Sequence, residues 1–271
     1  MTDTQQAQPR DLTRQIVVIS AMVFMIIAAM VGTGLLGGTA VQDLQGGALD
    51  EDGSYLAPAS PAFSIWSAIY LGLIAYTVWH ALPGQRTKPR QRAIGWWIAL
   101  TMVLNGLWLV LAQFTTLIAT VIGIVVLLIA LGITFRISVA TRDSEDGLVD
   151  ALLIDGVTGL HLGWVTLATV ANITAWLTQL APDAWGENAT TWGIVVLIVV
   201  GLIGLAIAWF SRGRLAPALA LAWGLSWLAV ARLTGEPESS GIGITAIIVA
   251  VVVLLAAVLV KTARVMWSSN D

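Results

Sequence analysis

Apolar runs free of Asp, Glu, Lys and Arg follow one another along the chain, separated by short polar segments. A bilayer core about 30 Å thick needs about 20 apolar residues in a helix, and most of the runs supply one such helix. The run at 93–135 would form a single helix roughly 65 Å long, so we expect it to fold back at residues 113–116. The pattern therefore predicts eight membrane-spanning helices. The runs cover residues 16–42, 53–85, 93–135, 156–182, 188–211, 215–231 and 239–260.

The composition supports the same fold class. Hydrophobic residues make up 58% of the chain and charged residues 11%, whereas a soluble globular domain carries about 25% charged residues. These values indicate an all-α membrane protein. Cysteine is absent, which excludes disulfides, thiolate metal sites and a cysteine nucleophile.

Lysine and arginine occur in alternate segments between the runs, and acidic residues occur in the others. Because cationic loops stay in the cytoplasm, we expect both termini to be cytoplasmic in a bacterial cell membrane. Residues 1–15 are expected to form a polar, disordered tail. Arg232, at the end of a run, is the one exception to the alternation. The cations are Arg10, Arg14, Arg86, Lys88, Arg90, Arg92, Arg136, Arg142, Arg212, Arg214, Lys261 and Arg264; the acidic segments hold Asp43, Asp50, Glu51, Asp52, Asp183, Glu187, Glu236 and Glu238.

Tryptophan is the unusual residue inside the runs, with 13 in the chain. Those near the ends of runs fit the aromatic belts of membrane interfaces; they are Trp79, Trp185, Trp192, Trp209 and Trp267. Four others lie deeper, each three or four residues from a polar or aromatic partner on the same helical face. These pairs are Trp66 with Tyr70, Trp108 with Asn105, Trp164 with His161, and Trp223 with Trp227.

Two interpretations of the deeper tryptophans stay open at this point. A buried indole N–H or asparagine amide must find a hydrogen-bond partner in hydrocarbon, so these groups face neighbouring helices or a cavity. Interhelical packing is the common use of such residues in membranes. A ligand cavity with a few polar groups among aromatic walls is the alternative. Periodicity does not choose between the two.

Three sequence motifs resemble the TspO/MBR family, the translocator proteins or tryptophan-rich sensory proteins. They are FSIWSAIY at 63–70, NGLWLVLAQF at 105–114 and HLGWVTLATVAN at 161–172, which resemble signatures of the family's second, third and fifth helices. The resemblance covers about residues 15–180. It implies a five-helix bundle over residues 16–182, and residues 183–271 would add three helices that have no counterpart in the five-helix core.

The resemblance also implies a pocket inside the bundle and a porphyrin or another tetrapyrrole as its ligand. Some family features are missing: no tryptophan precedes the second helix in YLAPASPAF at 55–63, and no Lys or Arg follows the fifth helix before Arg212. Cholesterol binding through a Tyr followed by Lys or Arg is therefore not expected. The predicted ligand-binding residues are Trp66, Tyr70, Asn105, Trp108, His161, Trp164, Ala168 and Asn172.

Four functions are compatible with this sequence. The first is a membrane sensor that binds a hydrophobic small molecule. The second is a transporter of such compounds, although residues 190–260 show no clear repeat of 60–180. The third, an enzyme that degrades porphyrins, is less favoured because the spans carry no catalytic acid, base or metal constellation. The fourth is a structural protein in which the tryptophans only pack helices.

The expected partners follow from the composition and the resemblance. They are a hydrophobic molecule such as a porphyrin, membrane lipid and, from the resemblance, a second copy of the chain in a homodimer. Nucleic acid, a resident cofactor and a metal ion are not expected. A lone His161 is a poor metal site, because His80 lies at the far end of a different run.

The alternation of charges generates a topology test. Reporter fusions placed after Ala140 and after Ser239 should report opposite sides of the membrane, because three predicted spans lie between the two positions. Alkaline phosphatase and fluorescent-protein fusions measure this directly. If the two sites report the same side, the predicted count of eight helices is wrong.

Overall fold

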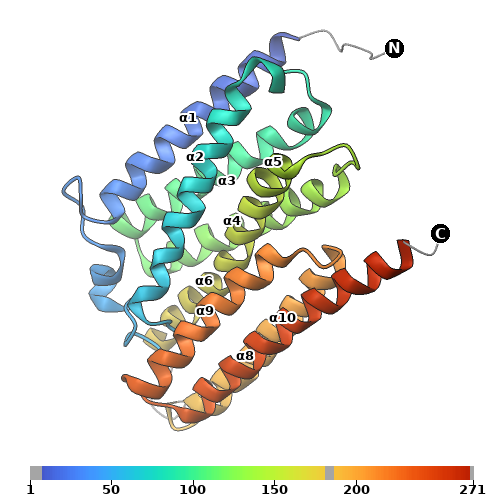
Figure 1. The fold of residues 1–271 in the computed structure, drawn as a ribbon. Helices are drawn as coiled ribbons and strands as arrows, with labels where there is room; N and C mark the ends of the chain where they lie inside the picture. The colour runs from blue at the N-terminus through green and yellow to red at the C-terminus, as the bar shows by residue number, and fades with distance from the viewer. Residues whose placement is uncertain (1–7, 181–185, 269–271) are drawn as a thin grey trace.

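The computed structural model describes residues 8–180 and 186–268, and within them it contains helices but no strand. Among these described residues, eight helices are long and apolar enough to cross a membrane, which confirms the count predicted from the charge-free runs. Figure 1 shows them as a tilted bundle in which α1 begins and α10 ends on the same side. The long helices are α1 (Pro9–Gly32), α2 (Ile65–Ala81), α3 (Pro89–Phe114), α4 (Leu117–Ala140), α6 (Val157–Leu180), α8 (Ala189–Phe210), α9 (Leu215–Thr234) and α10 (Ser240–Ser268).

Short helical pieces connect the long helices. The loop between α1 and α2 contains η1 (Val41–Gly47) and η2 (Ser60–Ser64), and η3 (Pro83–Gln85) follows α2. Before α6, the single turn α5 (Leu148–Asp150) and the π-helical η4 (Ala151–Gly156) extend the fifth span to 148–180. This span therefore begins earlier than the predicted residue 156. The fold-back between α3 and α4 lies at Thr115 and Thr116, inside the predicted turn.

The first helix begins at Pro9, not at Ile16. The expectation of a disordered tail through residue 15 is therefore wrong for residues 9–15, while residues 1–7 lie outside the described part. The reason is pairing between helices. Asp11 accepts from Arg14 at 3.0 Å and from Arg92 of α3 at 2.6 Å. The Asp11 and Arg14 side chains are buried. A carboxylate that pairs with two guanidiniums lets the helix extend through a polar segment.

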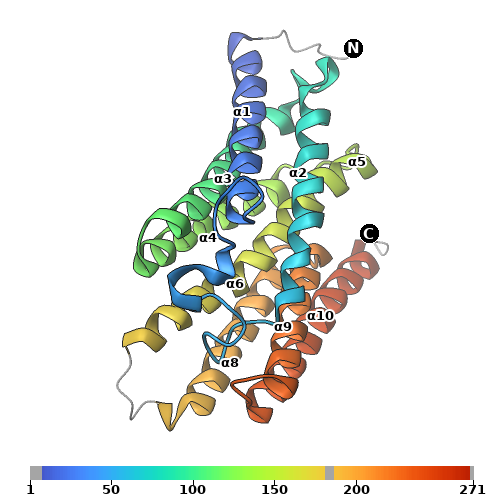
Figure 2. The same ribbon diagram turned by 90° about the vertical axis from the view of Figure 1, so that its left-hand side faces the viewer.

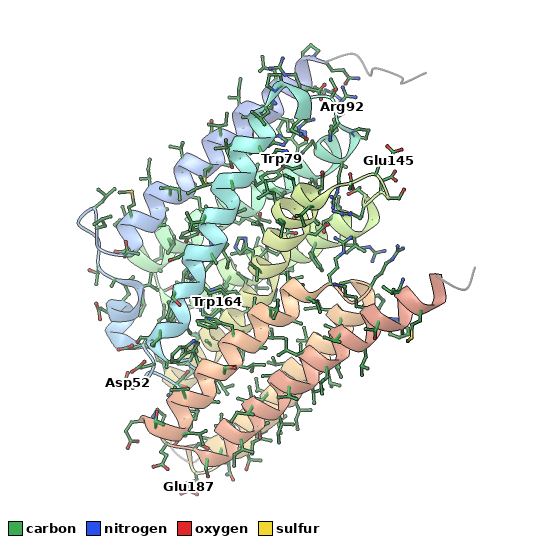
Figure 3. The ribbon with its side chains drawn as sticks, viewed as in Figure 1. Asp52, Trp79, Arg92, Glu145, Trp164 and Glu187 are labelled. Carbon is green, nitrogen blue, oxygen red and sulfur yellow. The ribbon has the colours of Figure 1, made fainter. Side chains whose placement is uncertain are left out.

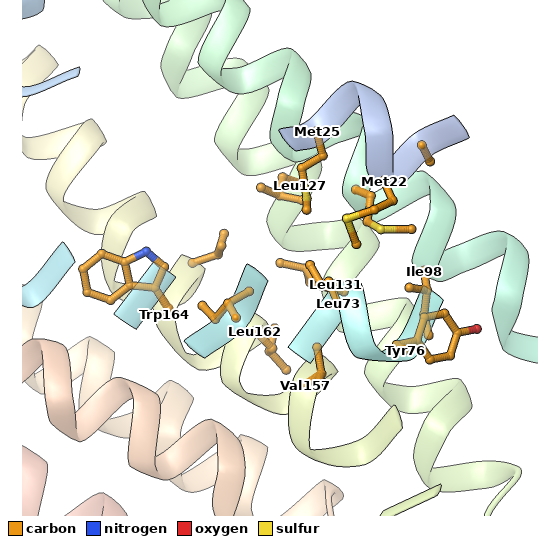
Figure 4. Packing of buried hydrophobic residues seen from close by; sticks show 14 of the residues in the cluster. Met22, Met25, Leu73, Tyr76, Ile98, Leu127, Leu131, Val157, Leu162 and Trp164 are labelled. Carbon is orange, nitrogen blue, oxygen red and sulfur yellow. The ribbon is translucent and has the colours of Figure 1, made fainter. Parts of the chain in front are cut away.

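Two hydrophobic cores hold the bundle together. The first is shared by α1, α2, α3, α4 and α6, and the second by α8, α9 and α10. In the first core, Met22 and Met25 of α1 lie near Leu127 and Leu131 of α4, as Figure 4 shows. The two cores meet where α9 packs on α6, and glycines allow that approach. A Cβ at Gly163 would overlap the Pro217 carbonyl oxygen of α9.

The two ends of the bundle differ in charge. One, here called the basic end, contains the cation-bearing segments; the other, the acidic end, contains Asp43, Asp50, Glu51, Asp52, Glu187 and Glu236. Figure 3 shows Arg92 at the first end and Asp52 and Glu187 at the second, with Trp164 between them and nearer Asp52. This arrangement follows the charge alternation of the sequence.

An ion cluster joins the two cores at the basic end. Asp155 of η4 pairs with Arg90 of α3 at 2.5 Å, with Arg142 at 2.9 Å, and with Arg214 at the start of α9. Arg90, only 5% exposed, also lies 3.2 Å from Asp146. Three arginines around one carboxylate therefore connect α3, the loop after α4, η4 and α9.

Substituting Gly163 tests the contact between α6 and α9. Gly163→Ala should destabilise the protein by about 1–3 kcal/mol, because its Cβ forces α9 away from α6. The matched control is Gly132→Ala, whose Cβ would meet no atom within 4 Å and which should be neutral or slightly stabilising. Thermal unfolding in detergent measures both variants. Equal melting temperatures would contradict the tight α6–α9 approach.

Asp155→Asn tests the ion cluster. Removing the shared carboxylate leaves Arg90, Arg142 and Arg214 near one another with less negative charge, and breaking a buried ion pair costs roughly 3 kcal/mol. Asp143→Asn, at an exposed position of the same loop region, is the control and should change stability little. The same thermal measurement applies, and a harmless Asp155→Asn would show that the cluster does not hold the two cores together.

Candidate functional site

A cavity of about 40 Å³ lies inside the first core, towards the acidic end. Its walls come from α2, α3, α4 and α6, and the loop between α1 and α2 forms its cover. The lining is apolar except for two asparagines and the indole nitrogens. It consists of Val41, Ala48, Leu49, Ala57, Pro58, Phe63, Trp66, Asn105, Trp108, Ile124, Leu127, Trp164, Val165, Ala168, Ala171 and Asn172.

Six of the eight residues predicted from the sequence line this one cavity: Trp66, Asn105, Trp108, Trp164, Ala168 and Asn172. The other two lie directly behind the lining. The Tyr70 hydroxyl donates to Asn105 Oδ1 at 3.2 Å, and the His161 ring meets the Trp66 ring edge-on at 5.7 Å. The structure thus brings all eight residues to one place, whereas a role in binding stays a prediction.

Trp66 is the centre of a group of aromatic rings. It stacks on Tyr70 with ring centroids 5.1 Å apart, and it meets Trp164 edge-on at 6.2 Å. Phe63 adds an edge-on contact with Trp164 at 5.7 Å. Such pairs contribute about 0.5–1.5 kcal/mol each beyond burial. They hold two indole rings rigidly at the cavity wall.

Five buried polar atoms in and beside this wall have no hydrogen-bond partner in the described residues. They are Asn105 Nδ2, Trp108 Nε1, His161 Nε2, Trp164 Nε1 and Asn172 Oδ1. Leaving such an atom unpartnered in hydrocarbon costs several kcal/mol, so buried polar atoms normally pair with protein or water. Packing between helices therefore leaves these five atoms without a partner. It does account for Trp223, whose Nε1 donates to the Ala62 carbonyl at 2.9 Å.

The lining defines what the cavity can bind. Asn105, Trp108 and Trp164 offer N–H donors, whereas no Lys, Arg, Asp or Glu is among the lining residues. A charged group placed there would lack a counter-ion, which is unfavourable in a low dielectric. The arrangement suits an apolar molecule with uncharged hydrogen-bond acceptors. In residues 8–180 and 186–268, no group of three His, Asp or Glu side chains could hold a metal ion.

His80 belongs to a different polar group, at the basic end of α2. Its Nδ1 lies 2.7 Å from Gln91 Oε1, and Tyr76 donates to the same oxygen at 3.1 Å. Arg14 Nε approaches His80 Nε2 at 3.4 Å. His80 is not among the residues that line the cavity, and its contacts connect α1, α2 and α3.

The cover of the cavity was missed by the sequence analysis. Six lining residues come from the segment between α1 and α2: Val41, Ala48, Leu49, Ala57, Pro58 and Phe63. Phe63 stands inside the FSIWSAIY motif and could have been included. Val41 begins the short η1, and the others lie in irregular backbone, where no periodicity indicates which side chain faces inward.

Helix α9 holds this cover from outside. Arg232 donates to the Glu51 carbonyl at 2.6 Å and to the Ser54 carbonyl at 3.2 Å, and the Ala59 N–H donates to the Trp227 carbonyl at 3.2 Å. Leu56 is buried in the core of α8, α9 and α10. Figure 2 shows the segment, in blue, passing from α1 to the start of α2 beside α9.

A further tie lies within the cover itself. Glu51 Oε2 accepts from the Ser60 N–H at 2.6 Å and from the Ser60 hydroxyl at 2.9 Å. These hydrogen bonds, together with nearby Arg232, hold the pKa of Glu51 below its usual range against the opposing effect of burial. Glu51 therefore stays ionised and fixes the segment 51–60 as a closed loop.

Comparison with known proteins gives one match. The family model described as TSPO-like protein matches residues 14–259. The match continues through α8 and α9 into α10, beyond the 15–180 region that carries the three motifs. No curated protein and no solved structure matches the chain. The chain is an integral, multi-pass membrane protein and belongs to the TSPO-like family.

Proposed function

We propose that the protein is a membrane sensor that binds a flat, largely apolar small molecule such as a porphyrin in the cavity between α2, α3, α4 and α6. The observation that carries this proposal is the set of five unpartnered polar atoms in an aromatic wall. A bound molecule would stack on the indole rings and accept hydrogen bonds from Asn105, Trp108 and Trp164. This arrangement is typical of small-molecule sites, in which a few polar groups orient an apolar ligand.

The charge around the cavity selects among porphyrins. The lining is uncharged, and the cover carries Asp50, Glu51 and Asp52 beside a single cation, Arg232. A porphyrin with free carboxylates would meet a negative cover. An esterified, neutral porphyrin should therefore bind more tightly than the corresponding acid.

The shape of the bundle favours sensing over transport. The Arg90–Asp155 cluster and the Asp11–Arg92 pair join helices at the basic end, which disfavours passage of a ligand through that end. We further propose that the basic end faces the cytoplasm of a bacterial cell. A homodimer, implied by the resemblance, is part of the same proposal.

Titration of the purified protein with protoporphyrin dimethyl ester tests the site. Trp164→Phe keeps an aromatic ring but removes the N–H donor, and it should weaken binding by roughly tenfold. Trp164→Ala also removes the stacking surface and should weaken it further, by about thirtyfold or more. The shift of the porphyrin absorption band and the quenching of protein fluorescence measure the dissociation constant.

The control is Trp209→Ala at the end of α8, where the indole is 65% exposed. It should leave the dissociation constant unchanged. If Trp164→Phe and Trp209→Ala weaken binding equally in folded proteins, the assigned cavity is wrong. If the parent protein binds neither the ester nor the free acid, the proposed function fails.

A further inference from the structure

Arg232 is the one cation that departs from the charge alternation of the chain. No other Lys or Arg occurs between Arg214 and Lys261, and Arg232 is completely buried at the acidic end. Burying a guanidinium is costly unless the protein satisfies its donors. The position therefore needs a specific set of acceptors, and their identity shows what the residue does.

The acceptors of Arg232 are backbone carbonyls, two of which belong to the cover of the cavity. They are Glu51 at 2.6 Å and Ser54 at 3.2 Å, and the third is Glu236 in the loop after α9 at 3.2 Å. A guanidinium presents five N–H donors in a fixed plane, so it can hold several carbonyls at once. Arg232 thus connects the end of α9 to the segment between α1 and α2.

Two more residues of α9 hold the same segment. The Trp227 carbonyl accepts from the Ala59 N–H, and Trp223 Nε1 donates to the Ala62 carbonyl. Trp223 and Arg232 are nine residues apart, which corresponds to about 13 Å along the helix. The segment is therefore attached along α9 at several points and not at one.

The attachment points flank the residues that close the cavity. Along the chain, Glu51 and Ser54 contact Arg232, then Ala57 and Pro58 line the cavity, then Ala59 and Ala62 contact α9, and Phe63 lines the cavity again. Leu56, next to Ala57, is buried in the C-terminal core. Moving Ala57 and Pro58 away from the cavity thus requires breaking contacts with α9.

We propose that Arg232, Trp223 and Trp227 of α9 keep residues 51–62 closed over the cavity, so that the C-terminal helices control entry of the ligand. As closed, the cavity of about 40 Å³ has room for about three water molecules, and a porphyrin enters only when this segment moves. Arg232 is a positioning residue, since it contacts the cover and not the cavity. The ligand part of this inference rests on the proposed function, whereas the closure of the cavity does not.

Cysteine labelling measures the closure without any ligand. The chain contains no cysteine, so Ala168→Cys places a single thiol in the cavity lining. Its reaction with a hydrophilic maleimide should be slow in the parent background. Arg232→Gln should accelerate it by roughly tenfold or more, because the segment loses its charged hydrogen-bond donor. Trp223→Phe, which keeps the ring and removes one donor, should accelerate it by a smaller factor.

Two controls separate opening of the cover from general loosening. Val253→Ala creates a void between α10 and α8, where Val253 packs against Gly204, and it should not accelerate labelling of Ala168→Cys. Thr39→Cys places a thiol at an exposed position. This thiol should react with the maleimide equally fast in the parent background and in Arg232→Gln. The proposal is overturned if Arg232→Gln leaves the labelling of Ala168→Cys unchanged, or if Val253→Ala accelerates it as much.

Binding kinetics then test the consequence for the ligand. With protoporphyrin dimethyl ester, Arg232→Gln should raise the association and dissociation rates together and change the dissociation constant by less than Trp164→Phe does. If Arg232→Gln accelerates labelling but the parent protein binds no porphyrin, the closure of the cavity by α9 is supported and the proposed function is refuted. Unchanged rates in a protein that does bind porphyrin would refute control by α9.

Discussion

Hydrocarbon offers no water to buried polar groups, and this constraint decides where the chain can place its charges and amides. At the basic end, Arg14 pairs with Asp11 and Arg90 pairs with Asp155. At the acidic end, the two terminal nitrogens of Arg232 donate to backbone carbonyls. Among the described residues, buried side-chain atoms without a partner occur at both ends too, but five of them gather around Trp66 and Trp164. The gathering of these atoms around one aromatic cavity makes it the candidate functional site.

The number of helices could be predicted because the same constraint excludes charges from spans, so charge-free runs mark them one by one. The start of α1 could not be predicted in this way. Asp11, Arg14 and Gln15 resemble a solvated tail when that segment is considered alone. They are helical and buried because Arg92 and His80, far along the chain, supply their partners. Pairing between distant segments leaves no periodic pattern in a single sequence.

The walls of the cavity were predictable and its cover was not. Helical spacing and the family motifs place Trp66, Asn105, Trp108, Trp164 and Asn172 on regular helices, whose geometry fixes the direction of each side chain. Ala48, Leu49, Ala57 and Pro58 lie in irregular backbone, whose course depends on where α9 attaches it. The three motifs lie within residues 15–180 and carry no information on that attachment, although the family match extends through α9.

Helix α9 affects the cavity from two directions. Gly224 packs beside Leu167 and the edge of the Trp164 ring, so α9 supports the wall from behind, while Arg232 and Trp223 hold the cover. Without α9, the bundle formed by α1 to α6 would keep the aromatic residues on their helices but would lose the outer support of residues 51–62. The two halves of the chain therefore contribute differently to one cavity: α2, α3, α4 and α6 supply its aromatic and amide wall, and α9 holds its cover.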